Sequence, residues 1–312
     1  MRIIKFFYAI VILFSLVNFF LCAKKVEKDF YVIGFSQYSS TDPLRIGMNE
    51  SIIKEAENCE KDIRIKYKDA GQDPLQQKSD IEEFLYEKAD LVIVAPGEKE
   101  IVSAGVEKIY REGIPVIILD KMISTKSFTC FIGIDNIEVG RLAASYAVKV
   151  INGEGKIIEI LGFPENEQSI ERSKGFREII NDYENIEILY TDFAGWMKSL
   201  AITKMEKALR LFDTIDLVYA HNDAMAVGAY LASLSHEREN QIAIVGIGGS
   251  EGENGGIQAV LDGKIDATVL YPTYGKEVIQ NAIKIFAGKK IAKINQVKPA
   301  IVTKENVESL LK

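Results

Sequence analysis

Short apolar runs recur along this chain, and amphipathic segments separate them. Continuous apolar runs are typical of strands that are buried on both faces of a parallel sheet. The amphipathic segments between them, such as Glu138–Val150, predict helices. The predicted strands are Tyr31–Phe35, Ile63–Tyr67, Leu91–Ala95, Val116–Leu119, Phe131–Ile134, Lys156–Leu161, Ile186–Tyr190, Leu217–Ala220, Ile242–Ile247, Ala267–Tyr271 and Val297–Thr303.

Strand and helix alternate throughout, and this alternation predicts an α/β protein with parallel sheets. A single sheet holding all these strands would be unusually wide, so we expect two similar lobes, each a parallel sheet flanked by helices. The natural division follows Phe131–Ile134, where Asp135 and Asn136 precede a long predicted helix. No Pro, Gly or Ser-rich linker lies there, so the connection must be short.

The segment Leu217–Tyr230 is the most informative part of the chain. An apolar strand stops at His221, Asn222 and Asp223, and a helix of small residues follows at once. Open α/β sheets bind ligands at the carboxyl ends of their strands. Asn222 or Asp223 alone is equally consistent with a helix N-cap. The polar ends of the other strands favour ligand contact for Asn222, whereas we expect His221 to support the turn from behind.

Polar and aromatic residues follow most of the other predicted strands too. Carboxylates and amides pair with hydroxyl groups and aromatic faces cover a ring, so this mixture favours a neutral polar ligand such as a sugar. The candidate ligand-binding residues are Gln37, Tyr38, Arg45, Asp120, Lys121, Asp135, Arg172, Phe193, Trp196, Asn222 and Tyr271.

Structural roles remain open for several of these residues. A turn cap is the alternative role for Asp120, and a surface ion pair with Glu171 or Glu167 is the alternative for Arg172, although ligand contact is favoured for both. For Phe193 and Trp196, the aromatic candidates that follow Ile186–Tyr190, a place in the core is the alternative to ligand contact.

The N-terminus has the features of a targeting segment. Arg2 and Lys5 precede an apolar run from Phe6 to Leu21, which is typical of a secretory signal peptide over residues 1–22. Cys22 ends the run and stands where a bacterial lipoprotein carries its lipid. We therefore expect an exported protein of the periplasm or cell surface. Lipidation of Cys22, cleavage after Ala23 and an uncleaved anchor all remain open.

Charge and cysteine content narrow the function classes. The net charge is −7 and no basic patch is present, so nucleic acid is not an expected partner. Cys59 and Cys130 lie far apart without metal or redox spacing, and with only two histidines in the chain we expect no metal and no cofactor. Two free thiols are favoured over a disulfide.

Catalytic patterns are weak. No G-x-S-x-G nucleophile turn is present. Gly246–Gly249 follows a strand as a dinucleotide-binding loop would, but Glu251 stands in place of the third glycine and no long helix is predicted to begin there. Asp120 and Asp135 offer a pair of carboxylates for glycoside cleavage, which is a minor alternative. The sequence therefore favours a binding protein over an enzyme.

Several motifs in one order resemble a known family. They are Gly34-Phe35-Ser36-Gln37, Asp120-Lys121, Asp135-Asn136, Glu171-Arg172-Ser173-Lys174-Gly175-Phe176 and Tyr219-Ala220-His221-Asn222-Asp223. Together they resemble the periplasmic sugar-binding proteins of ABC importers in the ribose- and galactose-binding group, most of all the galactofuranose-binding branch. The resemblance covers roughly residues 29–303.

The resemblance implies the type I periplasmic-binding-protein fold, in which three hinge strands join two lobes that close on a ligand. The N-terminal lobe would hold residues 29–134 and 272–295, and the C-terminal lobe residues 135–271 and 296–312. On the first lobe, Arg45 and Asp120 match contact positions of the family, and Lys121 stands where arginine is usual. On the second lobe, Arg172 and Asn222 match contact positions and Phe193 matches a flanking aromatic.

Three departures from the family pattern put its usual ligand in doubt. Gly248 stands where the family has an aspartate, Leu44 where close relatives have a stacking tryptophan, and Leu270-Tyr271 where Gln or Glu is usual. Tyr38 and Trp196 are candidates for the missing aromatic surface.

We therefore expect an exported, monomeric solute-binding protein that captures a sugar-like molecule and delivers it to an ABC permease. A ligand-sensing subunit that docks on a chemoreceptor or sensor kinase is the alternative. A transcriptional repressor of the same fold is disfavoured, because the signal peptide stands where a DNA-binding segment would be.

Overall fold

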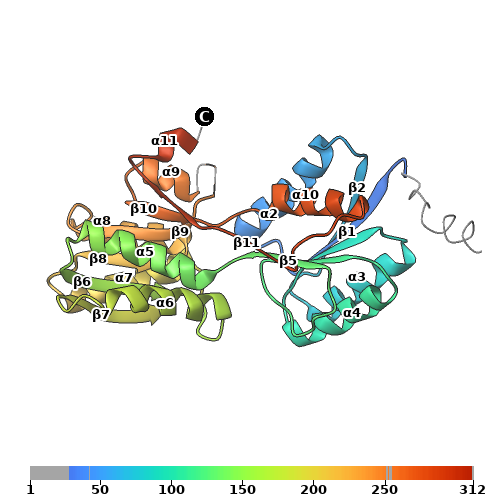
Figure 1. Ribbon diagram of the computed structural model, residues 1–312. Coiled ribbons are helices and arrows are strands. Elements are labelled where there is room, and N and C mark those ends of the chain that lie inside the picture. The colour runs from blue at the N-terminus through green and yellow to red at the C-terminus, as the bar shows by residue number, and fades with distance from the viewer. Residues whose placement is uncertain (1–27, 42, 251, 253–254, 311–312) are drawn as a thin grey trace, which may run out of the picture.

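The computed structural model describes residues 28–310 apart from positions 42, 251, 253 and 254. The expected signal peptide and Cys22 lie outside this range. The described chain forms two lobes side by side, and Figure 1 shows them joined by a narrow waist. The predicted α/β architecture with two similar lobes is confirmed. Among the described residues, no helix has both the length and the apolar character needed to cross a membrane.

The first lobe is built on a six-stranded sheet with the order β2-β1-β3-β4-β5-β11, in which every strand pair is parallel. Helices α2 and α10 pack together, as do α3 and α4. The elements are β1 Tyr31–Gln37, α2 Pro43–Asn58, β2 Ile63–Asp69, α3 Pro74–Tyr86, β3 Leu91–Ala95, α4 Lys99–Arg111, β4 Val116–Leu119, β5 Cys130–Ile134, α10 Gly275–Phe286 and β11 Ile294–Val297.

The second lobe repeats this topology with the sheet order β7-β6-β8-β9-β10-β12. Its last strand, β12, runs antiparallel to β10, so the expectation of purely parallel sheets is wrong at this edge. The elements are α5 Asn136–Val150, β6 Gly155–Leu161, α6 Glu167–Ile180, β7 Ile186–Phe193, α7 Lys198–Leu211, β8 Leu217–Ala220, α8 Asp223–Ser235, β9 Ala243–Gly248, α9 Gly256–Leu261, β10 Ala267–Leu270, β12 Ala300–Thr303 and α11 Val307–Leu310.

Three connections cross between the lobes, as the ribbon shows (Figure 1). They run from β5 to α5, from β10 to α10, and from β11 to β12. The predicted single strand Val297–Thr303 is wrong, because the chain changes lobe at Lys298–Pro299. Proline has no N–H to donate and therefore interrupts a strand. The expected lobe boundary at 295/296 is also misplaced, since β11 pairs with β5 as far as Val297.

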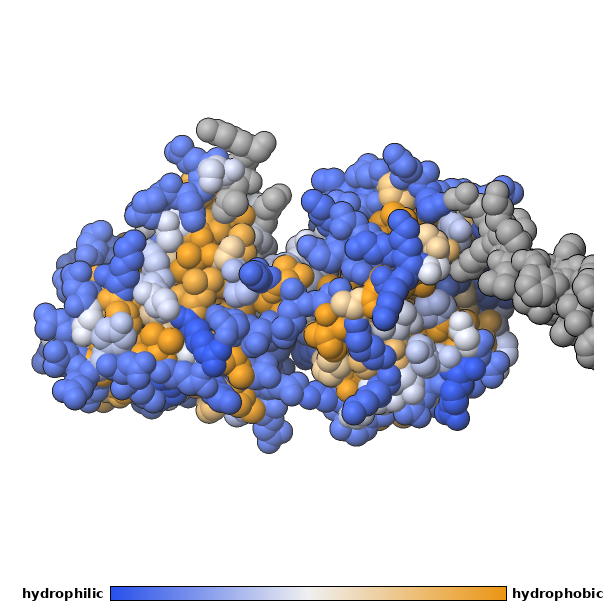
Figure 2. All heavy atoms as spheres, viewed as in Figure 1, coloured by the Kyte–Doolittle hydropathy of each residue, from blue (hydrophilic) through white to orange (hydrophobic). Residues whose placement is uncertain are grey.

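Apolar strands account for the core of both lobes. β3 is buried at every position, as continuous apolar runs in parallel sheets require. In the second lobe Phe176 of α6 stacks on Tyr219 of β8 with ring centroids 4.0 Å apart, which fixes α6 against the sheet. Hydrophilic side chains cover most of the face seen in Figure 2. Cys59 and Cys130 are both free thiols, as the favoured interpretation predicted.

Candidate functional site

A cavity of about 240 Å³ lies between the two lobes at the carboxyl ends of their strands. This is the edge at which open α/β sheets bind ligands. A cavity of this size has room for several water molecules or for one small ring. The lining residues are Leu44, Arg45, Asp120, Lys121, Asn166, Gln168, Arg172, Trp196, Asn222, Asp223, Ala224, Ile247, Gly248, Ser250 and Tyr271.

Three charged residues line the cavity from the first lobe. Asp120 and Lys121 follow β4, and Asp120 adopts a left-handed backbone conformation with φ of 69°. Arg45 comes from the first turns of α2 and donates to Oε1 of Gln37. Gln37 is fully buried and also donates to Asn49 Oδ1 over 2.8 Å. The prediction that Gln37 lines the cavity is therefore wrong. Gln37 lies behind Arg45 and orients it.

Arg172 of α6 is the central cation on the second lobe. It is only 4% exposed, so the alternative of a surface ion pair with Glu171 or Glu167 is wrong. Its Nε donates to Asn136 Oδ1 over 2.9 Å, and Nη1 donates to the carbonyl of His221 over 2.5 Å. Its guanidinium carbon lies 4.9 Å from the centre of the Tyr271 ring. These contacts fix the guanidinium at the cavity wall.

Asn222 serves two structural purposes at the start of α8. Its Oδ1 accepts from the N–H of Met225 over 2.8 Å, which makes it the helix N-cap. Its Nδ2 donates to the carbonyl of Trp196 over 3.1 Å, and both residues line the cavity. The cap and the cavity wall are therefore the same side chain. His221 is fully buried and does not line the cavity, which agrees with the prediction that it supports the turn from behind.

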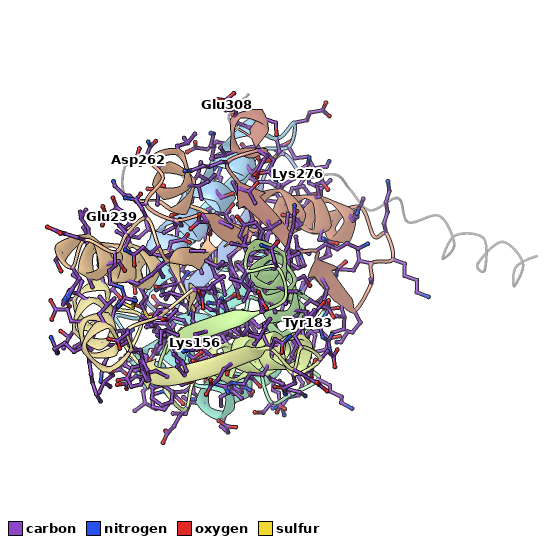
Figure 3. The ribbon with its side chains drawn as sticks, turned by 90° about the vertical axis from the view of Figure 1, so that its left-hand side faces the viewer. Lys156, Tyr183, Glu239, Asp262, Lys276 and Glu308 are labelled. Carbon is purple, nitrogen blue, oxygen red and sulfur yellow. The ribbon has the colours of Figure 1, made fainter. Side chains whose placement is uncertain are left out.

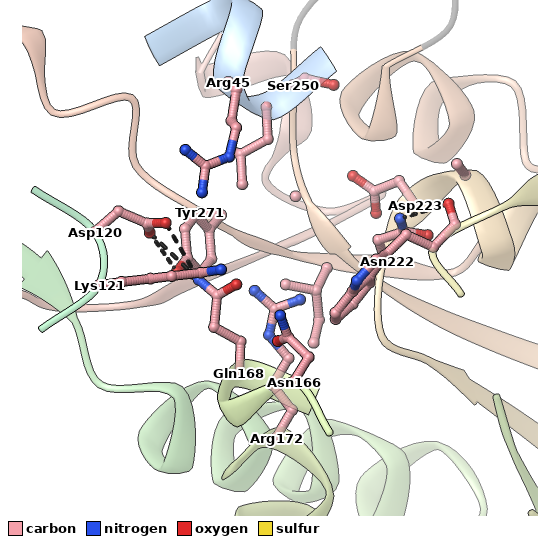
Figure 4. Close-up of a pocket in the computed structure, with 15 residues that line it drawn as sticks. Arg45, Asp120, Lys121, Asn166, Gln168, Arg172, Asn222, Asp223, Ser250 and Tyr271 are labelled. Atoms are coloured by element: carbon pink, nitrogen blue, oxygen red, sulfur yellow. Dashed lines mark hydrogen bonds between the residues drawn. The ribbon is translucent and has the colours of Figure 1, made fainter. Parts of the chain in front are cut away.

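A hydrogen-bonded chain crosses the cavity from lobe to lobe (Figure 4). The hydroxyl of Tyr271 donates to Asp120 Oδ1 over 2.7 Å. Nε2 of Gln168 donates to the same hydroxyl over 2.8 Å and lies 3.3 Å from Asp120 Oδ2. Burial and the neighbouring Asp120 raise the pKa of Tyr271, so its hydroxyl stays protonated and remains a donor. Lys99 of α4 and Glu167, which precedes Gln168 in α6, form a further ion pair of 2.6 Å between the lobes.

Three other predicted site residues do not line the cavity. Tyr38 packs its ring over Gly97, and its hydroxyl donates to the carbonyl of Gln72 over 2.9 Å. Asp135 caps α5, because its Oδ1 accepts from the N–H groups of Ile137 and Glu138. Asp120 and Asp135 therefore do not face each other across the cavity as a glycosidase pair would.

Phe193 is the third residue that misses the cavity. It ends β7, the outer strand of the second sheet, and is 42% exposed. Trp196, three residues later, does line the cavity, and its ring packs over Gly162. An aromatic surface is therefore present, but it comes from the turn after β7 and not from the strand.

Several lining residues escaped the sequence analysis. Asn166 and Gln168 belong to the polar loop and first turn of α6, and nothing in their spacing distinguished them from ordinary helix-start residues. Ile247 precedes Gly248 and Ser250 follows it by two residues, and the sequence analysis considered this segment only as a dinucleotide-binding loop and as a departure from the family pattern. These side chains reach the cavity because of the way the loops fold in space. The pattern of apolar and polar residues along the chain does not predict loop conformation.

Asp223 is the buried carboxylate that the sequence analysis left as a possible cap. Its Oδ1 accepts from the Thr268 hydroxyl and its Oδ2 from the N–H of Gly249, both over 2.6 Å. Burial raises its pKa to about 6, although these two donors oppose the shift. The carboxylate thus ties α8 to β10 and to the loop after β9.

The backbone conformation at position 248 and the nearby Asp223 carboxylate both favour glycine there. The backbone of Gly248 has φ of 145°, which favours glycine. A Cβ at this position would lie 2.5 Å from Asp223 Oδ2, closer than real Cβ atoms approach. An aspartate at 248 would therefore clash with Asp223, so the carboxylate that the family resemblance led us to look for has no room here.

Comparison with known proteins agrees with this geometry. Residues 33–290 match the periplasmic binding protein domain family, and the chain belongs to that family. The ribose import binding protein RbsB of Bacillus subtilis is 27% identical over 269 residues, covering 86% of this chain and 85% of that protein. The galactofuranose-binding protein YtfQ of Escherichia coli is 30% identical over 211 residues, or 64% of each chain.

Two solved structures share the fold at higher coverage. The fructose-binding periplasmic domain of a hybrid two-component system is 35% identical, covers 90% of this chain and 93% of its own, and has a TM-score of 0.80. An ABC transporter solute-binding protein of Bacillus halodurans with bound myo-inositol is 28% identical, covers 92% and 99%, and has a TM-score of 0.81. This is a family of solute-binding proteins, as the motifs of the sequence predicted.

Proposed function

We propose that this protein captures a sugar-like small molecule between its lobes and delivers it to an ABC permease. The observation that carries the proposal is the cavity between the lobes, which Arg45 and Asp120 line from one side and Arg172 and Asn222 from the other. A ligand held from both sides would stabilise one orientation of the lobes, so that the ligand-bound protein differs in shape from the free protein. The relatives named for ribose, galactofuranose, fructose and myo-inositol support a polyhydroxylated ligand.

The ligand contacts follow from the side chains that line this cavity. We expect Asp120 to accept from ligand hydroxyls and Trp196 to cover one face of the ring. Arg45, Lys121, Arg172 and Asn222 would donate to ligand oxygens. We expect Tyr271 to act mainly through Asp120, to which it donates. None of these groups is arranged to break a bond, so we propose binding without catalysis.

Thermal unfolding in the presence of small molecules tests the proposal. A ligand present at 100 times its dissociation constant stabilises a protein by about 2.7 kcal/mol, which raises the unfolding temperature measurably. The panel holds monosaccharides, sugar alcohols and disaccharides, with amino acids and nucleosides as controls. Stabilisation by at least one sugar is expected. Stabilisation by an amino acid or nucleoside alone, or by no compound, would contradict the proposed function.

A sensory role is the second candidate, and one specific comparison favours it. The solved fructose-binding domain, at 35% identity, belongs to a hybrid two-component system and not to an importer. Reconstitution distinguishes the two roles once a ligand is known. Uptake of the labelled ligand into vesicles that contain the cognate permease and ATPase supports import. Ligand-dependent phosphorylation of a partner kinase, without uptake, supports sensing.

Export and lipidation complete the proposal. The charged start, the apolar run and Cys22 support secretion and attachment of a lipid to the Cys22 thiol. Intact-mass spectrometry of the protein from bacterial membranes should show an N-terminal diacylglyceryl group. Cys22→Ser should release the protein into the soluble fraction. A wild-type mass that shows plain cleavage after Ala23 would contradict lipidation. We further propose that the exported protein is a monomer, which sedimentation velocity tests.

A further inference from the structure

A cluster of fully buried polar side chains lies in the second lobe, outside the lining of the cavity. Glu159 of β6 and Tyr219 of β8 are direct partners across the sheet, and His221 follows β8 with its ring 5.0 Å from the Tyr219 ring. All three residues are 0% exposed. Burying a carboxylate costs stability unless it is paired, and apolar residues in its place would often be as stable. The cluster therefore points to a role other than stability.

Helix α6 covers this cluster with polar side chains of its own. Ser169, Ser173 and Arg177 recur every four residues and so lie on one face of the helix. Ser169 Oγ lies 3.3 Å from Nδ1 of His221, and Arg177 Nη2 donates to Glu159 Oε2. The cluster is thus held between the sheet and the helix.

Glu159 and His221 are each other's available partners. Glu159 Oε1 lies 3.4 Å from His221 Nε2, and among the described residues no other group forms a hydrogen bond with either atom. Burial lowers the pKa of His221, which keeps its ring neutral at pH 7. Burial opposes ionisation of Glu159, yet His221 and Arg177 outweigh it and lower the Glu159 pKa. A neutral ring with its proton on Nε2 fits an ionised carboxylate on one side and the Ser169 hydroxyl on the other.

His221 connects the cluster to the cavity through its backbone. Its carbonyl accepts from Arg172 Nη1 over 2.5 Å. It directly precedes Asn222, which caps α8 and donates to the carbonyl of Trp196 over 3.1 Å. Arg172, Asn222 and Trp196 all line the cavity. A shift of the His221 ring would therefore move backbone that holds three residues of the cavity wall.

We propose that Glu159 is a positioning residue of the binding site, because it fixes the His221 ring and thereby the places of Arg172 and Asn222. This inference rests on the proposed function, since it assigns Glu159 a part in ligand affinity. Glu159 does not line the cavity and acts only through His221. A site whose side chains are held in place before binding loses affinity when those side chains become free to move.

The fluorescence of Trp196 tests this role without a ligand, because Trp196 is the only tryptophan in the chain. Glu159→Ala removes the contact with His221 and should make Trp196 more accessible to quenching by acrylamide. Glu159→Gln keeps an acceptor for Arg177 and offers His221 an amide donor, which the other ring tautomer accepts. It should therefore be quenched as wild type is. Equal quenching of Glu159→Ala and wild type, or equal changes in the Ala and Gln variants, would overturn the positioning role.

Glu178→Ala is the matched control on the same helix. It removes a carboxylate from an ion pair with Arg141 of 2.6 Å, and it leaves Glu159 and His221 untouched. Its Trp196 quenching should equal that of wild type. A change as large as in Glu159→Ala would show a general effect of losing a carboxylate from this lobe and would overturn the proposal.

Isothermal titration with the monosaccharides and sugar alcohols of the thermal panel gives the second measurement. A compound that binds wild type should bind Glu159→Ala about tenfold more weakly at unchanged stoichiometry, which is the weight of one hydrogen bond to a charged group. A lower stoichiometry with unchanged affinity reports only less folded protein and would overturn the positioning role while the proposed function stands. If wild type binds none of these compounds, the proposed function fails, and the quenching of Trp196 still decides the role of Glu159.

A second variant covers the case in which Glu159→Ala does not fold. Ser169→Ala removes the hydroxyl on the other side of the His221 ring and leaves every charge in place. It should raise the quenching of Trp196 in the same direction as Glu159→Ala. Quenching of Ser169→Ala equal to that of wild type would show that the ring does not depend on its buried partners, and would overturn the proposal.

Discussion

The hydroxyl of Tyr271, at the end of β10, donates to Asp120 Oδ1, at the end of β4, over 2.7 Å. The two residues belong to different sheets, so this bond spans the cleft between the lobes. Tyr271 stands where the resemblance led us to expect glutamine or glutamate. A tyrosine there gives Asp120 a neutral donor that burial keeps protonated. This bond holds the carboxylate in place before any ligand arrives.

Tyr271→Phe should destabilise the protein, because it removes a donor from a buried carboxylate and keeps the ring. A hydrogen bond to a charged group contributes about 1.5–3 kcal/mol, so a loss of about 2 kcal/mol is expected in urea unfolding. Tyr86→Phe is the matched control, since Tyr86 is 76% exposed and should change stability by less than about 0.5 kcal/mol. Equal unfolding midpoints for the two variants would contradict the role of the bond.

Two substitutions of Asn222 distinguish its role as a helix N-cap from its role as a residue that lines the cavity. Asn222→Ser keeps a good N-cap but is too short to reach the ligand, so stability should hold while affinity falls about tenfold. Asn222→Ala loses both and should also unfold about 1 kcal/mol more easily. Calorimetric titration and thermal unfolding of the two variants make the measurement. Unchanged affinity in Asn222→Ser would show that the residue is only a cap.

Arg172→Lys should weaken ligand binding about tenfold or more while the fold remains. Lysine keeps the charge but cannot reproduce the fork that donates to Asn136 and His221. Arg210→Lys is the control, since the Arg210 side chain is 61% exposed on α7. Equal affinity in the two variants, measured by titration with the best ligand, would place the binding site elsewhere.

The sequence carried enough information to predict several of the residues that line the cavity, because topology places strand ends together. Asp120 follows β4 directly and Asn222 follows β8 after one residue, and the carboxyl ends of parallel strands meet at one edge. Arg172 lies on the buried face of α6 together with Phe176, which stacks on β8. For these residues the local pattern determined the position in space.

Other positions depend on geometry that a periodic pattern does not contain. The register between β6 and β7 shifts at Ile157/Ile158, and such a bulge changes which side chains face the core beyond it. Phe193 lies at the far end of that irregular pair and is exposed. The run Val297–Thr303 is one apolar pattern, yet Pro299 divides it between two lobes. Neither the bulge in β6–β7 nor the change of lobe at Pro299 alters the pattern of apolar and polar residues, so this pattern alone predicts neither of them.

Gly248→Asp should destabilise the protein and should not create a new ligand contact. The substitution puts a side chain at φ of 145° and brings its Cβ within 2.5 Å of Asp223 Oδ2. Backbone strain of this kind costs about 1–3 kcal/mol, and crowding two carboxylates adds to it. Gly113→Ala is the control, because φ is 86° there and its Cβ would meet nothing within 4 Å. A Gly248→Asp protein no less stable than this control would contradict the crowding by Asp223.

The Asp223 carboxyl group should make the free energy of unfolding fall as the pH rises, and a variant without this group should show a smaller fall. Its pKa is about 6 in the folded protein and about 3.9 in an unfolded chain, so the folded state holds the proton more tightly. Its contribution to stability is therefore full below pH 4 and is lost as pH rises through 6, a change of about 3 kcal/mol. Asp223→Asn removes this titration, so its urea unfolding free energy should fall less than that of wild type between pH 4 and 7.

An exposed aspartate supplies the control of opposite sign. Lys264 lowers the pKa of Asp262, so any stability that this pair contributes is present at neutral pH and lost on acidification. Asp262, labelled in Figure 3, follows α9 and does not line the cavity. Asp262→Asn should leave the fall in stability from pH 4 to 7 as large as in wild type or slightly larger. If Asp223→Asn and wild type lose the same stability over that interval, Asp223 does not carry a raised pKa. The close packing of Gly246, Gly248 and Gly256 against the Asp223 carboxylate would then need another explanation.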